Sequence, residues 1–590
     1  MRAMAGIISL GDPRDSDWLR MLGRRMMAPV SPGREDGGEL YISQDRRVML
    51  ICENSQHGRQ RHGAGLAVGE GAHSQALALL GEIYRIRAAS CGTRQFATDA
   101  ERLLALVSGQ SEDVGPALAS VDGSFAVAWH DERTGQVVLA RDQFGMKPLH
   151  WAPVADGILF ATDVSCLFAT GLIRPAVDPL DFLYRSYCRM ECADNFSWYA
   201  GVRSLPSASL LLIQDGAWSV HQYWRPDSGE ERVDPAETCT AFLNAVKIRK
   251  RDEERVAGVL SGGVDSSAVF CALTDLGQEV SPYVVTYEGQ GRAQNKDLPY
   301  ARLAAESRGQ VLRRCEIGTD QIALLVEQVV TRVHRPFVHG VELALYQAYR
   351  NMAADGMFVS FSGHASDGCW GDQDGSDFPI LDIRGPVDIH SEFYLKNMIY
   401  RIERPLWHMM LDRITASLGI DEKEVTGRVW ERIFDSYRNF PSLDPHKRAR
   451  YHIMTKFGTY VNETIESCSA GFGITERTPF QDVELVDLAF RMPEFVKNHE
   501  GLTDMKPFLK SALAGVLPKE IVYRPKQGFP PPDDPVFLKQ LRYLATDIGM
   551  PFGAKFHAWE CDRLGVGELL YLCSAQIWLN SISHLPSSGR

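Results

Sequence analysis

The sequence predicts an α/β protein of two large domains, and three observations support that fold class. A chain of 590 residues is too long for a single hydrophobic core. Residues 1–225 contain short apolar runs separated by turn residues, which is typical of paired strands. Residues 226–590 alternate apolar runs with long helical stretches, which is typical of a parallel sheet, and become mostly helical beyond residue 392. The charged, proline-containing stretch 224–235 separates the two halves.

Composition narrows the class of protein. Hydrophobic residues make up 45% of the chain and charged residues 23%, as expected for a folded protein. The 63 basic and 75 acidic side chains give a net charge of −12, which disfavours nucleic acid as a partner. No apolar run has the length of a signal peptide or a membrane span, and the cysteines form no CxxC pair. We therefore expect a cytoplasmic protein with reduced thiols and no membrane partner.

Apolar runs of strand length locate the individual strands. A hairpin is predicted where residues 121–129 and 136–140 flank a turn-forming segment. The remaining strands are expected at 157–161, 209–213, 256–260, 282–286, 310–313 and 357–361. The last four lie in the second half and are separated by helical stretches, so their carboxyl ends should share one edge of a parallel sheet.

The strongest chemical signal is the segment Leu-Ser-Gly-Gly-Val-Asp-Ser-Ser at 260–267, between a predicted strand and a predicted helix. Its two glycines let backbone N–H groups approach an anion, its serines add donors, and the following helix contributes positive potential. The lysine of a Walker loop is absent. The segment therefore predicts a pyrophosphate-binding loop for ATP, in which Asp265 would hold Mg²⁺. The residues expected at the nucleotide are Leu260, Ser261, Gly262, Gly263, Asp265, Ser266 and Ser267, with Val285 on the next strand.

A second polar turn, Ser-Gly-His-Ala-Ser-Asp, follows another predicted strand and begins at Ser362. We expect Ser362 and Gly363 to contact ATP, because loops after neighbouring parallel strands converge. Asp367 would then share the metal with Asp265. His364 is a candidate proton acceptor beside the reacting carboxyl group, with a loop hydrogen bond as the equal alternative.

Basic candidates lie near the C-terminus. Lys526 is bounded by proline and glycine, and Arg524 and Lys506 are close to it in sequence. On spacing alone, a solvated position on the surface is the more common interpretation of the two lysines.

Four segments of the second half resemble the synthetase domain of the asparagine synthetase superfamily. They are Ser-Gly-Gly-Val-Asp-Ser-Ser from 261, Ser-Gly-His-Ala-Ser-Asp from 362, Glu-Arg-Thr-Pro-Phe-Gln-Asp from 476 and Arg-Pro-Lys-Gln-Gly-Phe from 524. In the first half, Gly-Glu-Ile-Tyr from 81, Asp-Gly-Ser-Phe-Ala from 122, Arg-Asp-Gln-Phe-Gly-Met-Lys-Pro-Leu from 141 and Phe-Ala-Thr-Asp from 160 resemble its glutaminase domain. The likeness covers nearly the whole chain.

This resemblance implies a fold and a set of roles. Residues 1–225 should form an Ntn-hydrolase-like αββα domain. Residues 226–590 should form a doubly wound, parallel-sheet ATP-pyrophosphatase domain, similar to the adenine nucleotide α-hydrolases, with a helical C-terminal part. The resemblance also makes Lys526 a catalytic candidate, with Lys506 beside it.

The glutaminase half departs from the family pattern at three places. The family's nucleophilic cysteine precedes Gly-Ile, whereas Ala5 stands there in this chain. The asparagine before Gly-Glu-Ile-Tyr is replaced by Leu80, which cannot donate a hydrogen bond to an oxyanion. The family's His-Arg-Gly-Pro-Asp segment is absent, and Pro-Gly-Arg-Glu-Asp occupies 32–36. We therefore predict that this half does not hydrolyse glutamine.

Branches of the superfamily with this loss resemble β-lactam synthetases and lasso-peptide macrolactam synthetases. At the third position of the Ser-Gly-x turn, asparagine synthetases carry glutamate and β-lactam synthetases carry tyrosine, whereas this chain has His364. Glu466, with Glu463 beside it, falls about where the glutamate of the β-lactam Tyr–Glu pair would lie. Both carboxylates are catalytic candidates, with a helix-surface position as the alternative.

The favoured hypothesis is a lasso-type cyclase that uses ATP and Mg²⁺. It would join an Asp or Glu side chain of a precursor peptide to the peptide's N-terminal amine, and would work with a leader-binding protein and a leader peptidase. The acidic segment 371–379 would line a wider cleft, with a solvated acidic loop as the more common interpretation of such a segment. The alternatives are a β-lactam-type synthetase, an ammonia-dependent asparagine synthetase, a non-catalytic scaffold, and a tRNA-modifying enzyme, which the acidic charge balance disfavours.

Overall fold

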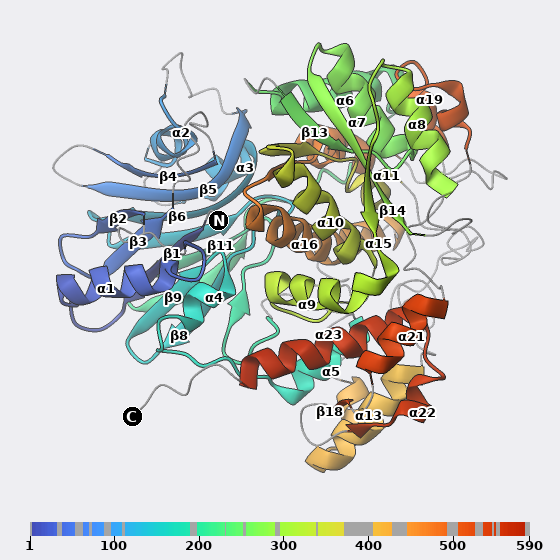
Figure 1. Ribbon diagram of the computed structural model, residues 1–590. Helices are drawn as coiled ribbons and strands as arrows, with labels where there is room; N and C mark the ends of the chain where they lie inside the picture. The colour runs from blue at the N-terminus through green and yellow to red at the C-terminus, as the bar shows by residue number, and fades with distance from the viewer. Residues whose placement is uncertain are drawn as a thin grey trace.

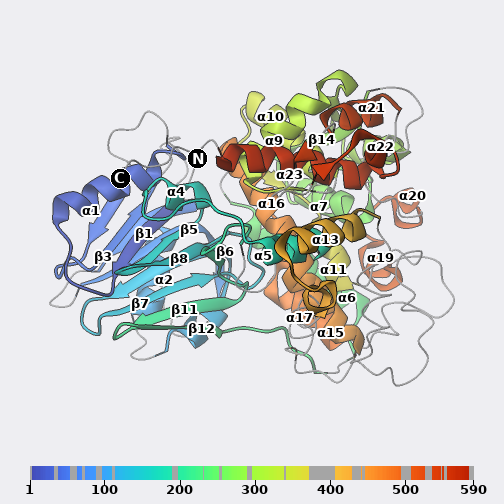
Figure 2. The same cartoon turned by 90° about the horizontal axis from the view of Figure 1, so that it is seen from below.

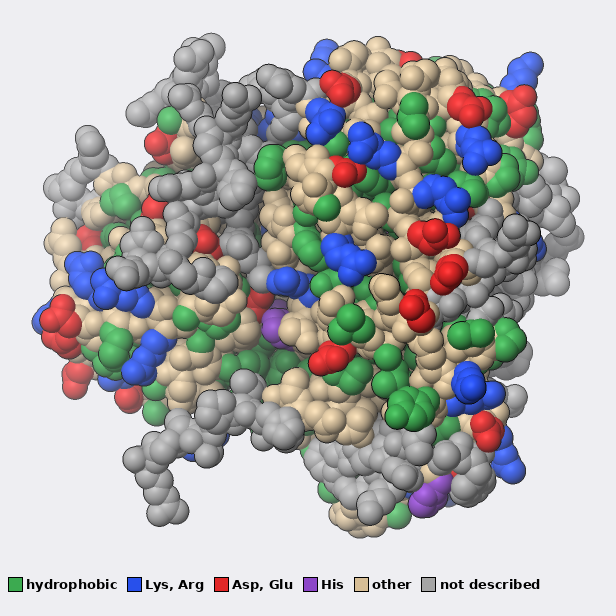
Figure 3. Space-filling view, viewed as in Figure 1, with side chains coloured by type: hydrophobic (Ala, Val, Ile, Leu, Met, Phe, Trp, Pro, Cys, Tyr) green, Lys and Arg blue, Asp and Glu red, His purple; other side chains and the backbone are tan. Residues whose placement is uncertain are grey.

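The computed structural model places the chain in two halves that lie side by side (Figure 1). It describes residues 3–31, 38–53, 63–69, 74–87, 96–108, 113–188, 197–229, 232–251, 255–288, 296–337, 340–370, 405–427, 440, 445–492, 506–524, 535–545, 548–549 and 555–583. Within these ranges, no helix combines the length and the apolar character needed to cross a membrane. On the face shown in Figure 3, acidic and basic side chains are interspersed rather than gathered by sign.

The N-terminal half contains two six-stranded sheets whose strand pairs are antiparallel. The first has the order β10-β8-β9-β1-β3-β2 and the second β12-β11-β7-β6-β5-β4. The strands of the first sheet are β1 (Met4–Ser9), β2 (Glu39–Ile42), β3 (Val48–Cys52), β8 (His150–Val154), β9 (Gly157–Ala161) and β10 (Arg203–Ser204). Those of the second are β4 (Gly63–Val68), β5 (Gln75–Ile86), β6 (Val121–Asp131), β7 (Gln136–Arg141), β11 (Ser209–Gln214) and β12 (Ala217–Gln222).

Helices cover the outer faces of both sheets. The helices α1 (Ser16–Met27) and α4 (Val164–Phe168) pack on the first sheet, and α2 (Asp99–Val107) and α3 (Gly115–Ala119) on the second. Apolar side chains from both inner faces fill the space between the sheets. The αββα layers and the β6–β7 hairpin are therefore confirmed.

The C-terminal half is built on a five-stranded parallel sheet with the order β15-β14-β13-β16-β17. Its strands are β13 (Arg255–Val259), β14 (Glu279–Tyr287), β15 (Arg313–Ile317), β16 (Val359–Phe361) and β17 (Thr475–Arg477). After β13, the chain adds β14 and β15 on one side of that strand. It then adds β16 and β17 on the other side, so the strand order reverses between β13 and β16. In open α/β sheets, ligands bind beyond the carboxyl ends of the strands at such a reversal.

One predicted strand is misplaced. The strand expected at 310–313 begins only at its last residue, and β15 extends to Ile317. Gly309 has a φ of +65° at the turn after α8 (Leu298–Glu306), and Val311 is 83% exposed. An apolar run alone did not distinguish this exposed connection from a buried strand.

Helices surround the parallel sheet and form most of the described residues that follow it. The others in this half are α6 (Pro235–Arg249), α7 (Val264–Asp275), α9 (Ile322–Val333), α10 (Gly340–Ala354), α11 (Ser366–Trp370), α13 (Pro405–Leu418), α15 (Pro445–His452), α16 (Gly458–Gly471), α17 (Val483–Arg491), α19 (Pro507–Leu513), α20 (Lys519–Val522), α21 (Pro535–Leu544), α22 (Ala558–Cys561) and α23 (Val566–Ser583). Helix α5 (Pro179–Cys188), although it belongs to the first 225 residues, packs against α13, as Figure 2 shows.

Buried ion pairs join the two halves. Arg477 donates two hydrogen bonds to the carboxylate of Glu82, at 2.8 and 2.7 Å, and both side chains are almost fully buried. Arg249 bridges Asp122 of β6 to Asp482, at 3.3 and 3.0 Å. Charges removed from water in this way depend on each other, because either partner alone would be a buried, uncompensated ion.

We expect Glu82→Ala to lower the free energy of unfolding by about 3–5 kcal/mol, because it leaves the Arg477 guanidinium buried without its carboxylate. Urea unfolding followed by circular dichroism would measure the change. The matched control is Asp156→Ala, which breaks an exposed pair with Arg14 and should change the stability by about 1 kcal/mol or less. Equal effects of the two substitutions on the free energy of unfolding would contradict a stabilising role of the buried Arg477–Glu82 pair.

Candidate active site

The first loop turns sharply after β13. Leu260 N–H donates to the Tyr283 carbonyl at 2.8 Å, so the loop starts from the sheet itself. Gly262 has a φ of +77°, and a Cβ there would lie 2.4 Å from the backbone nitrogen of Ala301, so only glycine fits. The hydroxyls of Ser261 and Ser266 are 3.0 Å apart and hold the two ends of the loop together.

Helix α7 begins inside this loop and offers an uncapped N-terminus. Its N-cap is Gly263, which has no side chain to accept a hydrogen bond from the first turn. The twelve-residue helix therefore presents free N–H groups and the positive end of its dipole at the loop. That combination suits a phosphate group. Val285 lies near the carboxyl end of β14, the strand that neighbours β13.

The second loop contacts the first through the backbone. Ser362 N–H donates to the Arg477 carbonyl at 3.3 Å, which ties this loop to β17. A Cβ on Gly363 would lie 2.4 Å from both the carbonyl carbon of Asp265 and the nitrogen of Ser266. The two loops predicted to converge are thus in direct contact, at the point where the strand order reverses.

A lysine lies between the two aspartates. Lys506 Nζ is 2.7 Å from Asp265 Oδ2, donates to Ser366 Oγ at 3.2 Å, and forms an ion pair with Asp367. Ser366 Oγ in turn donates to Asp265 Oδ1 at 2.6 Å. The sequence placed Lys506 only near Lys526, whereas the structure places its ammonium group at the centre of the loop cluster.

The two carboxylates fit a magnesium ion that travels with a nucleotide. Mg²⁺ is commonly held by one or two carboxylates together with substrate phosphates and water. Asp265 and Asp367 supply such a pair, and the Asp367 side chain is half exposed. Among the described residues, no group of three or more His, Cys, Asp or Glu side chains forms a complete metal cage, so the remaining ligands would come from phosphate and water.

Arg524 connects the C-terminal segment to the first loop. Its Nη1 donates to the Gly262 carbonyl at 2.7 Å, its Nη2 pairs with Asp297, and its guanidinium lies 4.3 Å from the centre of the Tyr300 ring. The side chain is buried, so these contacts fix the chain two residues before Lys526. Lys526 itself lies outside the described residues, as does the acidic segment 371–379.

Comparison with known proteins identifies the family. Residues 238–551, more than half of the chain, match the family model described as asparagine synthase. The chain belongs to the asparagine synthase family. Residues 68–224 match the model of a glutamine amidotransferase domain, so both halves have family counterparts.

Relatives with known names resemble the chain at low identity. The asparagine synthetase [glutamine-hydrolyzing] 3 of Bacillus subtilis is 24% identical over 471 residues, which cover 76% of this chain and 74% of that protein. The asparagine synthetase [glutamine-hydrolyzing] 2 of the same organism is 21% identical over 90% of this chain and 72% of its own length. The amidase chry2 of Gibberella zeae is 27% identical over 44% of this chain and 41% of its own length. Family membership makes this chain an ATP-dependent amide-forming ligase.

The position of the family's glutaminase nucleophile is buried in this enzyme. Ala5 lies within β1, is fully buried, and pairs with Ile51 and Ala161. The preceding peptide N–H, of Met4, donates to Thr162 Oγ1 at 3.0 Å. Leu80 lies in β5, where it contributes to the core between the sheets. The segment 32–36 lies outside the described residues.

His364 of the second loop is a neutral imidazole at neutral pH. Burial lowers its pKa to about 4, and the nearby Asp367 carboxylate and Asn462 amide only partly oppose this effect. Within the described part of the chain, its Nε2 atom is buried and has no hydrogen-bond partner. Phosphate anions bound beside the imidazole would raise its pKa.

Glu466 and Glu463, the other candidate proton acceptors, have partners from the N-terminal half. Both lie on α16, where Glu466 forms a buried ion pair with Lys147 and Glu463 accepts a hydrogen bond from Arg141 Nη2 at 3.3 Å. The structure therefore shows these carboxylates at the junction of the two halves, where paired charges hold α16 against the N-terminal sheets.

Sequence reasoning did not identify Glu476 as a functional candidate at the site. It lies on β17 opposite Ser360 of β16, and its side chain is 1% exposed. Burial raises its pKa to about 7, although the hydroxyls of Ser362, Ser360 and Tyr349 and the charge of Lys147 oppose this. The one signal in the sequence was its place as the first residue of the family motif Glu-Arg-Thr-Pro-Phe-Gln-Asp.

Glu476 should make the stability of the enzyme depend on pH. Because its pKa of about 7 in the folded state lies above the ordinary glutamate value of 4.5, the folded state keeps the proton to a higher pH than the unfolded chain does. Its contribution to the stability therefore falls as the pH rises from about 4.5 to 7, by about 3 kcal/mol in total. We expect Glu476→Gln to be more stable, relative to the unsubstituted enzyme, at pH 8 than at pH 5. Urea unfolding at both pH values measures this, and a difference independent of pH would contradict it.

Proposed function

We propose that this enzyme joins a carboxyl group and an amine of one substrate molecule, through an acyl-adenylate formed from ATP. The observation that carries the proposal is the combination of intact nucleotide loops with Ala5 at the position of the glutaminase nucleophile. A buried methyl group cannot attack glutamine, so the amine must come from another source. Leu80 supports the same conclusion, since its side chain offers no hydrogen bond to an oxyanion.

The substrate that we favour is a lasso-type precursor peptide. An Asp or Glu side-chain carboxyl would be joined to the peptide's N-terminal amine to close a macrolactam, and a leader-binding protein and a leader peptidase would be the expected partners. Support comes from the resemblance of this chain to superfamily branches whose glutaminase half is inactive. A β-lactam-type synthetase acting on a small amino acid derivative is the second candidate. The third candidate is an asparagine synthetase that takes free ammonia, although the relatives of that name are described as glutamine-hydrolyzing.

The first step activates the acid. A carboxylate oxygen of the substrate attacks the α-phosphorus of ATP, the bond to the β-phosphate breaks, and pyrophosphate leaves with the electron pair. The loop at 261–267 and the N-terminus of α7 would hold the phosphates, while Asp265 and Asp367 would hold Mg²⁺, which neutralises phosphate charge when bound. The Lys506 ammonium lies between these carboxylates, from where it can form an ion pair with the phosphates of bound ATP. Most of the catalysis would come from positioning and charge neutralisation.

The second step forms the amide. The amine nitrogen attacks the acyl carbon, the carbon–oxygen bond to AMP breaks, and the nitrogen loses a proton. The structure favours His364 as the acceptor, because its neutral Nε2 has no partner within the described residues while Glu466 and Glu463 are engaged with Lys147 and Arg141. Lys526 would stabilise the adenylate oxygens and the tetrahedral intermediate.

We expect Lys526→Ala to lower turnover by a factor of about 10²–10³, because one charge-stabilising contact in the transition state is lost. Binding of ATP should remain, since the loop at 261–267 and α7 are unchanged. Release of pyrophosphate measures turnover, and calorimetric titration with ATP measures binding. A fully active variant would remove Lys526 from the mechanism.

Mass spectrometry of candidate peptides incubated with enzyme, ATP and Mg²⁺ tests the proposed function. The expected result is a peptide that has lost one water, with AMP and pyrophosphate formed in equal amounts. A parallel incubation with glutamine should release no ammonia above the rate without enzyme. Formation of ADP in place of AMP, or ammonia from glutamine at a rate comparable to turnover, would refute the proposal.

A further inference from the structure

A buried asparagine of α16 connects the second loop with the N-terminal half. Asn462 is fully buried, its Nδ2 donates to the Phe144 carbonyl at 2.8 Å, and its Oδ1 accepts from Gln481 Nε2 at 3.1 Å. The same side chain is hydrogen-bonded to the imidazole of His364. Phe144 lies in the N-terminal half, Gln481 follows β17, and His364 belongs to the second loop, so one amide joins three segments that are distant in sequence.

The orientation of this amide is fixed by its partners. A main-chain carbonyl only accepts hydrogen bonds, so the NH2 group of Asn462 must face Phe144. The NH2 group of Gln481 only donates, so the amide oxygen of Asn462 must face Gln481. Gln481 is itself oriented, because its Oε1 atom accepts from Thr478 Oγ1 at 2.7 Å. The Asn462 amide therefore cannot turn over without losing two hydrogen bonds.

The Phe144 carbonyl lies in a turn that the N-terminal half holds rigidly. The buried carboxylate of Asp142 accepts three main-chain N–H groups of this turn, at 3.0, 3.1 and 3.3 Å, from Phe144, Met146 and Lys147. Several charge-assisted bonds to one carboxylate fix the backbone around it. The position of the Asn462 side chain is therefore set from the half that lacks the glutaminase nucleophile.

The bond to Asn462 determines which ring nitrogen of His364 carries the proton. Burial lowers the pKa of His364, and the contact with Asn462 opposes that shift, as a hydrogen-bond acceptor does, so the amide oxygen faces the ring. Because an amide oxygen can only accept, the ring nitrogen that faces it must carry the N–H group. The imidazole is neutral, so its other nitrogen then holds the lone pair that a proton acceptor needs. The alternative tautomer would break the bond to Asn462.

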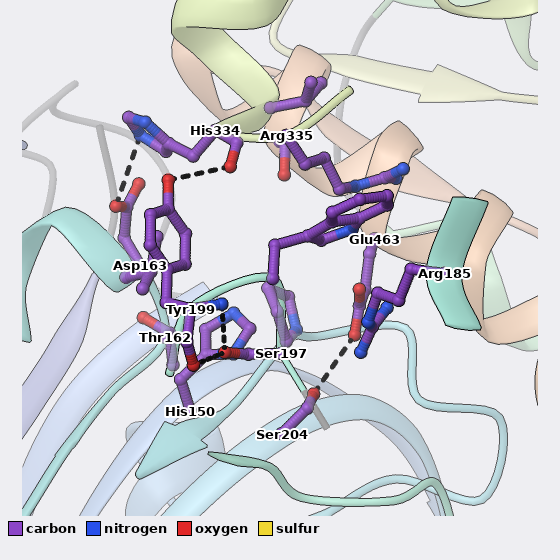
Figure 4. Close-up of a pocket in the computed structure, with 15 residues that line it drawn as sticks. His150, Thr162, Asp163, Arg185, Ser197, Tyr199, Ser204, His334, Arg335 and Glu463 are labelled. Carbon is purple, nitrogen blue, oxygen red and sulfur yellow. Dashed lines mark hydrogen bonds and ion pairs between the residues drawn. The ribbon is translucent and has the colours of Figure 1, made fainter. Parts of the chain in front are cut away.

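The neighbouring carboxylates of α16 have other partners. Glu463, the residue after Asn462, turns toward Ser204 in a separate pocket between the halves, and its Oε1 accepts from the Ser204 hydroxyl at 3.5 Å (Figure 4). Glu466, about one helical turn after Asn462, is paired with Lys147. Of these three residues of α16, Asn462 is thus the one that is hydrogen-bonded to the histidine of the second loop.

We propose that Asn462 is a positioning residue for amide formation, which holds His364 in the tautomer that can accept the amine proton. The Phe144 carbonyl holds Asn462 in turn, so the N-terminal half contributes to this step without any glutaminase chemistry. This role rests on the proposed function, in which His364 is the proton acceptor of the second step. Adenylate formation, the first step, needs no proton acceptor and should not depend on Asn462.

Nitrogen NMR of the enzyme labelled with nitrogen-15 at histidine tests this tautomer without a substrate. The signals of His364 are assigned by their loss in His364→Gln. At neutral pH we expect one protonated and one unprotonated ring nitrogen in the unsubstituted enzyme. Asn462→Leu keeps a side chain of similar size but removes the acceptor, so both tautomers should be populated in that variant.

The two reaction steps separate a positioning role from a structural one. Asn462→Leu should lower the rate of amide formation about tenfold, as expected for one lost hydrogen bond, when the dehydrated peptide is measured by mass spectrometry. Exchange of labelled pyrophosphate into ATP, which reports adenylate formation, should keep the unsubstituted rate. The control is Asn351→Leu, at an asparagine of α10 that likewise accepts from a glutamine, Gln347, at 3.1 Å. It should change neither rate.

Three results would overturn the proposal. They are a mixture of tautomers in the unsubstituted enzyme, a single unchanged tautomer in Asn462→Leu, and an equal loss of both rates in that variant. Should Asn462→Leu fail to fold, the tautomer of the unsubstituted enzyme decides alone. The absence of AMP and of dehydrated peptide with the unsubstituted enzyme would instead refute the proposed function, which the NMR measurement does not involve.

Discussion

Lys506→Met is expected to lower the rate of adenylate formation by a factor of about 10²–10³. The ammonium group of Lys506 is the cation that contacts both Asp265 and Asp367, and its side chain is 4% exposed. Methionine fills the space but removes one positive charge from beside the entering phosphates. The loss of that charge matters most in the transition state, where negative charge shifts toward the leaving pyrophosphate.

Exchange of labelled pyrophosphate into ATP in the presence of the acid substrate measures this step directly. The control is Lys519→Met, which removes an exposed lysine of α20 and should leave the rate unchanged. If Lys506→Met retained the full exchange rate, the ammonium group would only hold the empty loops together. A lower affinity for ATP with unchanged exchange at saturation would likewise place its role in binding alone.

Gly363→Ala is expected to lower turnover by about 10²-fold or more. The added Cβ would lie 2.4 Å from two backbone atoms of the first loop, the carbonyl carbon of Asp265 and the nitrogen of Ser266. Neither atom belongs to a flexible side chain, so the loops must separate by a distance of the order of 1 Å. A displacement of that size at reacting groups is enough for such a loss.

Turnover and melting temperature should be measured together for this variant. The control is Gly515→Ala, since a Cβ at Gly515 meets no atom within 4 Å and should change neither quantity. Wild-type turnover in Gly363→Ala would show that the two loops do not act as one nucleotide site. A variant that melts at the wild-type temperature but is inactive would attribute the loss to the site itself.

The positions of the loops were predictable because they depend on local chemistry. Gly262 and Gly263 between a strand and a helix, together with the neighbouring serines, indicate an anion-binding turn. The carboxyl ends of parallel strands meet at one edge, so the convergence of the first loop with Ser362 and Gly363 followed from the order of strands and helices. The replacements at Ala5 and Leu80 could likewise be recognised without a structure, because the sequence alone shows that the functional groups are missing.

Other assignments depended on contacts between distant parts of the chain. Lys506 lies 241 residues from Asp265, and nothing near it in sequence indicates that its ammonium group reaches that carboxylate. Glu466 matched a catalytic position by sequence, yet Lys147, 319 residues away, pairs with it across the junction of the halves. Spacing along a chain cannot show which charge fills a buried site, because that depends on which elements pack together.

The sequence by itself determined the family, the two nucleotide loops and the loss of the glutaminase nucleophile. These follow from short motifs, in which neighbouring residues alone set the backbone shape and the available functional groups. Only the tertiary structure decided which lysine meets the paired aspartates and that burial raises the pKa of Glu476. The physical reason is that desolvation and long-range ion pairing arise only when separate elements pack and exclude water.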